Sequence, residues 1–342
     1  MRSKRNDRIF LLLSLGILFA GTVWWFIPIS EAVIEDISYH VLSSDVVSRP
    51  APLMQGNYGV GLVQKKYVDV PPGDRPQQVE FSIAAGEKFS PYLILINNTN
   101  NPFPVLVSAI LDYKQVYFTL DGINNLLHYV TIPPKTELNI PLELSIESAG
   151  IHDLIFVSFY FPDSHPWLNS HREELLWASV GGRRCVVKVG ESDVASRNLV
   201  PDYYGNKIEN HIRTEEVDFL RITRLEDEDP AQRKLFSARV ARGEVFKAEL
   251  IVKNEIYEQL TNFSVMLFLN YHQVPVNHQD ILMISLYQWE YSTVDFSVET
   301  PQQPGVHELQ AIYILDPYQS LLEDEIVSPF VLESPRVGLI VR

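Results

Sequence analysis

The sequence predicts an all-β protein, in which two tandem antiparallel β-sandwiches follow one N-terminal transmembrane helix. Three observations predict this fold: an uncharged apolar run over residues 9–29, an internal repeat at an offset of about 157 residues, and short β-patterned segments within each repeat. The chain has 342 residues, 46% of them hydrophobic. It is therefore long enough for two domains that each bury a core.

The apolar run at residues 9–29 is long enough to cross a bilayer, because a helix of about 20 residues spans ~30 Å. Residues 1–8 before it carry four Lys or Arg and one Asp. Glu31, Glu35 and Asp36 follow it. Since Lys and Arg resist translocation, we expect residues 1–8 to form a cytoplasmic basic tail and the remainder to be extracytoplasmic. The predicted location is the cell membrane, with a single pass.

A cleaved signal peptide is the alternative interpretation of this segment. Ser30 and Ala32 supply the small residues of a cleavage site. The apolar region of a signal peptide normally runs for only about 7–15 residues, however. The length of the run and the bulky Trp24, Trp25 and Phe26 favour a retained signal anchor.

The rest of the chain repeats itself in three blocks of the same order. The first block begins at Gly86 and recurs at Gly243. The second begins at Leu111 and recurs at Leu269, and the third spans Gly150 and Gly305. The matched pairs include Phe89 with Phe246, Asn97 with Asn254, Tyr113 with Tyr271, Gln115 with Gln273 and His152 with His307.

Each repeat consists of short runs rich in β-branched and aromatic residues, separated by Asn, Pro and Gly. About seven such strands in 100–120 residues are typical of a two-sheet antiparallel sandwich. The predicted strands are 78–87, 90–97, 104–113, 128–133, 136–146 and 152–161 in the first repeat, and 235–244, 247–254, 263–271, 292–299 and 307–315 in the second.

Certain motifs of the repeats resemble bacterial immunoglobulin-like or fibronectin-type modules. They are the Gly-Glu turns at Gly86 and Gly243, the strand 136–144 after a Pro-rich turn, and the Gly-x-His-x-Leu corners at Gly150 and Gly305. The resemblance covers residues 60–190 and 217–342. It implies an immunoglobulin-like sandwich fold in each repeat and says almost nothing about a ligand.

These observations divide the chain into six segments. Residues 30–58 form a juxtamembrane linker, within which residues 37–42 form one edge strand of the first sandwich. The polar stretch 191–216 forms a second linker. The segments are 1–8 (basic tail), 9–29 (anchor), 30–58 (linker), 59–190 (first sandwich), 191–216 (linker) and 217–342 (second sandwich).

The formal net charge of −15 argues against nucleic-acid binding, because so acidic a body repels phosphate backbones. Cys185 is the single cysteine, so the chain forms no intramolecular disulfide. It lies in an alternating segment with Val187 and Val189. We therefore predict a buried strand thiol, with a reactive or intermolecular thiol as the alternative.

The longest insertion in the repeat, residues 161–177, contains the candidate binding residues. Imidazole and carboxylate groups in one loop can bind a divalent metal, and a long loop at a sandwich tip is a common place for binding residues. The spacing fits no tight metal template, and a solvated loop is the competing interpretation. The metal candidates are Asp163, His165, His171 and Glu173, and the partner or ligand candidates are Trp167, His171 and Trp177.

His152 and His307 recur at one position in both repeats, which is better explained by the fold than by catalysis. We expect each imidazole to hydrogen-bond a loop carbonyl at a strand corner. No catalytic motif, phosphate loop or dinucleotide fingerprint is present, so we predict neither an enzyme nor a cofactor.

The predicted function is that of a membrane-anchored binding or spacer protein, which acts through its tandem domains on another envelope protein or a glycan. Two alternatives remain open. One is an envelope enzyme acting on glycans through Asp163 with Glu173 or Glu174, and the other is an assembly factor for a membrane complex.

Overall fold

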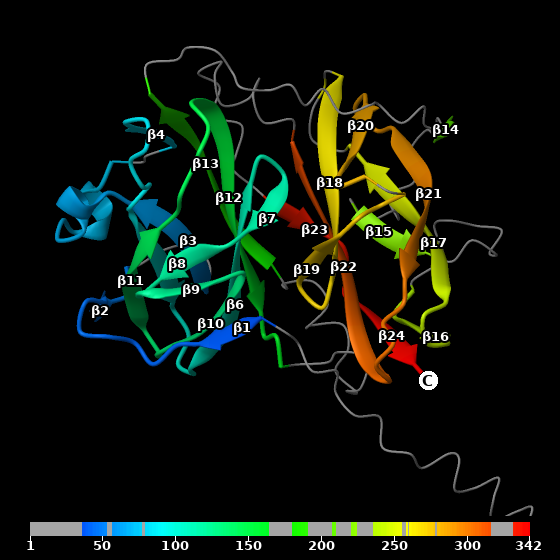
Figure 1. Ribbon diagram of the computed structural model, residues 1–342, viewed down its shortest axis with the longest axis horizontal. Helices are drawn as coiled ribbons and strands as arrows, with labels where there is room; N and C mark the ends of the chain where they lie inside the picture. The colour runs from blue at the N-terminus through cyan, green and yellow to red at the C-terminus, as the bar shows by residue number, and fades with distance from the viewer. Residues whose placement is uncertain are drawn as a thin grey trace, which may run out of the picture.

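The computed structural model describes residues 36–52, 57–76, 79–163, 180–190, 207–209, 220–223, 235–254, 258, 260–277, 279–315 and 331–342. These residues form an all-β structure of several sheets (Figure 1). No helix within them has the length and apolar character needed to span a membrane. The predicted anchor at residues 9–29 lies outside the described ranges.

The first unit is a sandwich of two sheets. Its inner sheet has the order β1 (Ile37–Tyr39), β10 (Leu127–Ile132), β6 (Phe103–Leu111), β12 (Gly150–Tyr160), β13 (Val180–Val189) and β4 (Glu80–Ile83), with β7 (Lys114–Val116) paired to β6. Its outer sheet has the order β3 (Tyr58–Val63), β5 (Tyr92–Asn97), β11 (Thr136–Glu143), β8 (Phe118–Leu120) and β9 (Ile123–Asn125), with β2 (Val47–Pro50) paired to β11.

The second unit has the same two-sheet plan. Its inner sheet has the order β16 (Ser237–Val240), β24 (Val337–Val341), β22 (Gly305–Leu315), β18 (Thr261–Leu269) and β19 (His272–Val274), with β20 (Leu282–Leu286) on β18 and β23 (Val331–Glu333) on β22. Its outer sheet has the order β14 (Lys207–Glu209), β21 (Tyr291–Glu299), β17 (Val245–Lys253) and β15 (Leu220–Thr223). Each unit buries its own apolar core.

The inner sheets are buried on both faces, which their sequences reflect. β12 is buried at its first ten positions, and β6 and β18 contain runs of six buried residues. β21 of an outer sheet instead alternates between buried and more exposed positions. A strand covered on both sides needs a continuous apolar run, whereas a strand with one solvated face alternates.

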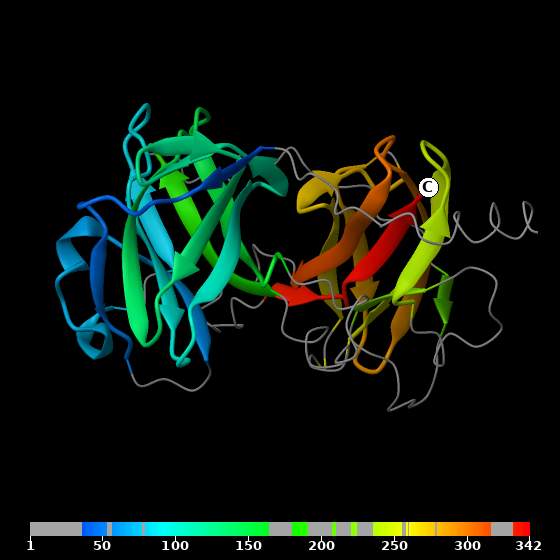
Figure 2. The same cartoon turned by 90° about the horizontal axis from the view of Figure 1, so that it is seen from below.

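The two inner sheets face each other (Figures 1 and 2). Side chains from both sheets form a third apolar cluster, which we call the junction. Ile155, Val157 and Phe159 of β12 point into the junction, while Leu154 and Phe156 point into the core of the first unit. The buried members of the junction are Leu106, Ile110, Tyr113, Leu127, Ile155, Val157, Phe159 and Val180 from the first unit, and Met266, Phe268, Tyr271, Ile281, Met283, Ile312, Ile314 and Val331 from the second.

Two equivalent hairpins meet at the junction and exchange hydrogen bonds. The turn between β6 and β7 has positive φ at Asp112 (47°) and Tyr113 (67°), and the turn between β18 and β19 has 50° and 67° at its two central residues. Successive positive φ angles are typical of tight hairpin turns. The side-chain oxygen of Gln273 accepts from the backbone N–H of Gln115 (2.7 Å), and that of Gln115 accepts from Gln273 (2.9 Å).

The same two glutamines also donate across the junction. Nε2 of Gln115 donates to the carbonyl of Tyr271 (3.0 Å), and Nε2 of Gln273 donates to the carbonyl of Tyr113 (2.8 Å). The four bonds are reciprocal, as across a two-fold interface between identical subunits. The repeat pairs Tyr113–Tyr271 and Gln115–Gln273 therefore lie where the two units contact each other.

A buried ion pair extends the junction on one side. The guanidinium of Arg336 donates to both carboxylate oxygens of Glu308 and to the hydroxyl of Tyr271 (2.9 Å). It also donates to the carbonyl of Phe161 in the first unit (3.3 Å), and the Tyr271 hydroxyl donates to the carbonyl of Pro162 (3.1 Å). The first unit has its own buried pair, Arg184 with Asp153, with Nε to Oδ1 at 2.9 Å.

A side chain of the second unit packs closely on a glycine at the junction. A Cβ atom on Gly182 of β13 would lie 2.2 Å from Cγ2 of Val331 on β23. A larger residue at this position would therefore require Val331 or one of the two strands to shift.

The structure confirms several strand predictions and adds elements that the sequence did not indicate. The edge strand expected at residues 37–42 is present as Ile37–Tyr39, and Cys185 is a fully buried thiol on β13 whose pKa is raised by burial. The predicted linkers, however, contain paired strands. β2 lies within residues 30–58, and β14 lies within residues 191–216.

Replacing Gln115 or Gln273 with Ala should destabilise the folded protein by about 1–2 kcal/mol, because a part-buried backbone N–H then loses its acceptor. The double variant should cost less than the sum of the single variants, since the two side chains act in one reciprocal network. Urea unfolding of the four species measures this coupling. Gln303→Ala, at an exposed position, serves as the control; strictly additive losses would contradict the reciprocal arrangement.

Candidate functional site

Of the loop residues predicted as binding candidates, the structure describes Asp163. Its carboxylate accepts a hydrogen bond from the hydroxyl of Tyr129, whose ring lies 5.0 Å from that of Tyr39. Burial, together with this bond to a carboxylate, raises the pKa of Tyr129. The other candidates lie outside the described residues, and their roles stay predictions; they are His165, Trp167, His171, Glu173 and Trp177.

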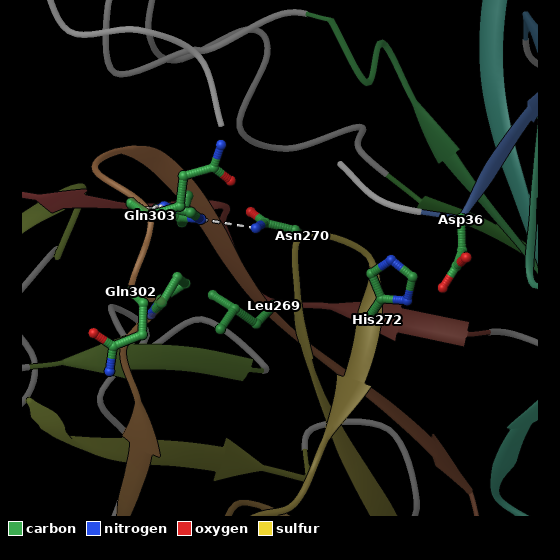
Figure 3. A pocket seen from close by; sticks show the side chains of 8 residues that line it. Asp36, Leu269, Asn270, His272, Gln302 and Gln303 are labelled. Carbon is green, nitrogen blue, oxygen red and sulfur yellow. Dashed lines mark hydrogen bonds between the residues drawn. The ribbon is translucent and has the colours of Figure 1, made fainter. Parts of the chain in front are cut away.

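The described ranges contain no group of three His, Cys, Asp or Glu side chains arranged to hold a metal ion. They do contain a pocket of about 430 Å³ at one end of the second unit (Figure 3). Three segments that are distant in sequence form it: the β18–β19 hairpin, the β21–β22 turn and the chain just before β1. The lining residues are Asp36, Leu269, Asn270, His272, Pro301, Gln302, Gln303 and His307.

The wall of this pocket is the histidine corner of the second unit. Nδ2 of Asn270 donates to Nδ1 of His307 (2.8 Å), and Nε2 of His307 donates to the carbonyl of Gln303 (2.8 Å). Oδ1 of Asn270 accepts from the backbone N–H of Glu308 (2.9 Å). Burial lowers the pKa of His307, so its imidazole is neutral at pH 7 with the proton on Nε2.

The first unit has the same corner with one change. Nε2 of His152 donates to the carbonyl of Ser148 (2.9 Å), and Nδ1 donates to Oδ2 of Asp112 (2.7 Å). Because both ring nitrogens face acceptors, the bond to Asp112 raises the pKa of His152 above its ordinary value. The prediction that these recurrent histidines bond loop carbonyls is therefore confirmed in both units.

Most polar atoms of the corner are already used within the protein, which limits what the pocket can recognise. Gln302 packs over Gly243, where a Cβ atom would lie 2.1 Å from its Nε2. The side-chain amides of Gln302 and Gln303, the carboxylate of Asp36 and the imidazole of His272 also line the pocket. These groups can hydrogen-bond a polar segment or a small polar ligand.

A pair of histidines, with His128 buried and His40 half-buried, fixes the strand that follows Asp36. Nε2 of His40 lies 2.7 Å from Nδ1 of His128, and Nε2 of His128 faces the carbonyls of Phe118 (3.1 Å) and Asn125 (3.2 Å). His128 thus donates through Nε2 and accepts through Nδ1. Burial and the neighbouring His40 together lower the pKa of His128 to about 4. This bond requires a neutral His128.

Sequence reasoning missed the pocket, because no local motif links Asp36, Asn270 and Gln302. The one sequence signal near the pocket was the recurrence of His152 and His307, which indicates the histidine corner but not the cavity beside it. The two corners also differ because the first has Asp112 where the second has Asn270. This difference is found in the sequence only when the second blocks of the two repeats, which begin at Leu111 and Leu269, are aligned.

No protein-family model matches the chain, and no curated protein matches it in sequence. Among solved structures it is similar to red sea bream transglutaminase (9% identity, TM-score 0.24, 84% of this chain and 32% of that chain) and to the C-terminal domain of the Streptococcus agalactiae AgI/II polypeptide BspA (7%, 0.23, 83% and 99%). It is also similar to E. coli alpha-2-macroglobulin (12%, 0.24, 82% and 19%).

The chain thus spans about a third of the length of the transglutaminase and a fifth of that of the macroglobulin. TM-scores this low carry no argument about function.

Asp112→Asn should lower the pKa of His152, as in the corner of the second unit, and Asn270→Asp should raise that of His307. Because folded His152 titrates above 6.5, its pairing stabilises the wild type fully below that pH and is lost as the pH rises through the folded pKa. NMR titration of the two imidazoles and urea unfolding from pH 5 to 9 test this. Unchanged imidazole titrations in both variants would contradict the assignment.

The His40–His128 bond should make the protein less stable in acid. An unfolded histidine takes up a proton near pH 6.5 while folded His128 does so near 4, so stability is lost as the pH falls through that window. His128→Asn removes this titration. The stability difference between wild type and this variant should therefore shrink from pH 6.5 to 4, measured by urea unfolding; a difference independent of pH would refute the expectation.

Proposed function

We propose that this protein is a membrane-anchored, extracytoplasmic binding or spacer protein of the cell envelope, built from two immunoglobulin-like sandwiches. Its task is to hold a recognition surface at a fixed distance and orientation from the membrane. The partner is another envelope protein. No catalytic step is assigned to it.

The observation that carries this proposal is the junction. Sixteen buried side chains from the two units form one apolar cluster, and reciprocal glutamine bonds cross it. Domains joined by a flexible linker move relative to one another by default, unless their interface is large and apolar. A body made rigid in this way transmits the position of its anchored end to its far end, which is what a spacer requires.

The position of Asp36 supports the same interpretation. Asp36 is the first described residue after the apolar run 9–29, and it lines the pocket beside the Pro301–Gln303 turn of the second unit. β1 then pairs with β10 of the first unit. The chain that follows the proposed anchor therefore contacts both units, so both are oriented relative to it.

Affinity capture from the native envelope tests this function. Tagged full-length protein and a soluble chain of residues 33–342 should recover the same envelope protein, identified by mass spectrometry. The double variant Gln115→Ala/Gln273→Ala should recover several-fold less of it, because a loosened junction no longer fixes the binding surface. Asn124→Ala, at an exposed position on β9 away from the junction and the pocket, is the control and should recover as much as the wild type.

Two results would contradict the proposal. Recovery of no partner by either chain removes the binding role. Recovery of the partner by the full-length, anchored chain alone would mean that the partner binds the membrane segment, as expected of an assembly factor for a membrane complex.

A further inference from the structure

Three of the exposed large apolar side chains lie at one end of the second unit, which we call the distal tip. Leu260, Tyr287 and Trp289 are 51%, 55% and 49% exposed. Leu260 precedes β18 and Tyr287 follows β20, and the adjacent residues Thr261 and Leu286 are a register pair of those strands. The three residues therefore lie close together although up to 29 positions separate them.

The turn that carries Trp289 is firmly held. Its backbone N–H donates to the carbonyl of Asn254 (2.6 Å), and the N–H of Tyr287 donates to Oε2 of Glu290 (2.8 Å). Nδ2 of Asn254 donates to the carbonyl of Leu286 (3.1 Å). Trp289 itself has φ of 69°, a left-handed conformation that is a genuine outlier for a bulky residue.

The equivalent turn of the first unit shows that a tryptophan is not needed to form it. There Nδ2 of Asn97 donates to the carbonyl of Ile132 (3.1 Å), as Asn254 does to Leu286. The third residue after Ile132 is Lys135, with φ of 52°, and the third after Leu286 is Trp289. The turn thus imposes a positive φ in both units, whereas the bulky side chain at Trp289 is not required by the turn. A bulky residue kept in a strained conformation without a folding reason is a reason to look for function.

Apart from Lys253, which is buried, the charged side chains that the structure describes at the distal tip are acidic. Between Asn254 and Pro335 the sequence has twelve Asp and Glu residues and no Lys or Arg. Residues 36–190 of the first unit, in contrast, have fifteen acidic and eleven basic residues. Glu258 and Glu290 belong to the same end of the second unit as the exposed rings. A cationic partner is therefore attracted to this end, and an anionic one is repelled.

The distal tip also lies far from Asp36, the first described residue after the apolar run 9–29. β18 connects them: Leu269 at its end lines the pocket with Asp36, and Leu260 directly precedes its start (Figure 1). Nine strand residues at about 3.4 Å each separate the two ends by roughly 30 Å. On the proposed function, this end is the one held away from the membrane.

We propose that the distal tip binds an arginine-bearing segment of the partner protein, with a guanidinium stacked on Trp289 or Tyr287 and paired with Glu290 or Glu258. Arginine fits better than lysine, since its planar group both stacks on aromatic rings and bonds carboxylates in pairs. Trp, Tyr and Arg are also the residues on which binding energy in protein interfaces concentrates. The inference rests on the proposed function and names the surface through which it acts.

Peptide binding to the full-length protein in neutral detergent tests the proposal, with fluorescein-labelled hexa-arginine as the probe. Trp289→Asn should weaken binding about tenfold, because it removes the ring while asparagine tolerates positive φ. Glu290→Gln should weaken binding several-fold and reduce its salt dependence, since it keeps an oxygen for the Tyr287 N–H and removes the charge. Thermal unfolding of both variants verifies that they fold.

Matched controls come from the first unit. Tyr117→Asn removes a ring that is 55% exposed, and Glu143→Gln removes an exposed carboxylate; both should change the affinity less than twofold. Wild-type protein should bind hexa-arginine more tightly than hexa-lysine. Equal affinities for the two peptides, or full binding by Trp289→Asn, would overturn the proposal. So would Trp289-dependent binding of a neutral cellohexaose without any effect on hexa-arginine, which would assign the tip to a glycan.

Envelope capture with Trp289→Asn separates this inference from the proposed function. Loss of the partner seen with the wild type supports both. Retention of that partner overturns the role of the distal tip and leaves the binding function standing, whereas a wild-type chain without any partner refutes the function itself.

Discussion

The mutual burial of the two inner sheets is the constraint on which the rest of this structure depends. It requires strands such as β12 to be apolar on both faces, with Leu154 and Phe156 toward one core and Phe159 toward the junction. Each fully buried side chain of this kind contributes about 1.5–3 kcal/mol of gross stabilisation, against about 1 kcal/mol net for a hydrogen bond. Apolar area therefore holds the units together, and the glutamine bonds determine their relative position.

These separate roles of the apolar area and the glutamine bonds explain which residues the two repeats share. A flat apolar contact tolerates sliding, but Gln115 and Gln273 can exchange bonds in one arrangement only, because each accepts from and donates to fixed backbone groups. The hairpin turns and histidine corners present those backbone groups. The shared Tyr and Gln pairs build the junction, and the shared His pair supports its hairpins. Phe89 and Phe246 instead lie in the cores of the two units. These shared residues are therefore fold residues, even where their side chains are chemically versatile.

The sequence predicted part of the strands of both repeats, the buried Cys185 and the histidine corners, because each depends on local periodicity or on the comparison of the repeats. It did not indicate the junction. A continuous apolar run shows that a strand is covered on both faces, but not by what. Short strands such as β2 and β14 have no periodicity to detect. The pocket joins Asp36 to a turn near residue 302 through tertiary structure alone, and most candidates in residues 163–177 lie outside the described ranges.

The differences between the repeats are more informative about function than their agreements. Duplicated units that share a junction must keep the same interior, so their surfaces are where they can diverge at little cost in stability. The surface of the second unit differs from that of the first in three ways. Asn270 stands where the first unit has Asp112, Trp289 stands where it has Lys135, and the sequence between Asn254 and Pro335 has no Lys or Arg. These changes give the second unit an acidic surface with exposed aromatic side chains. The fold does not require this surface, so a role in binding is a better explanation for it than a role in folding.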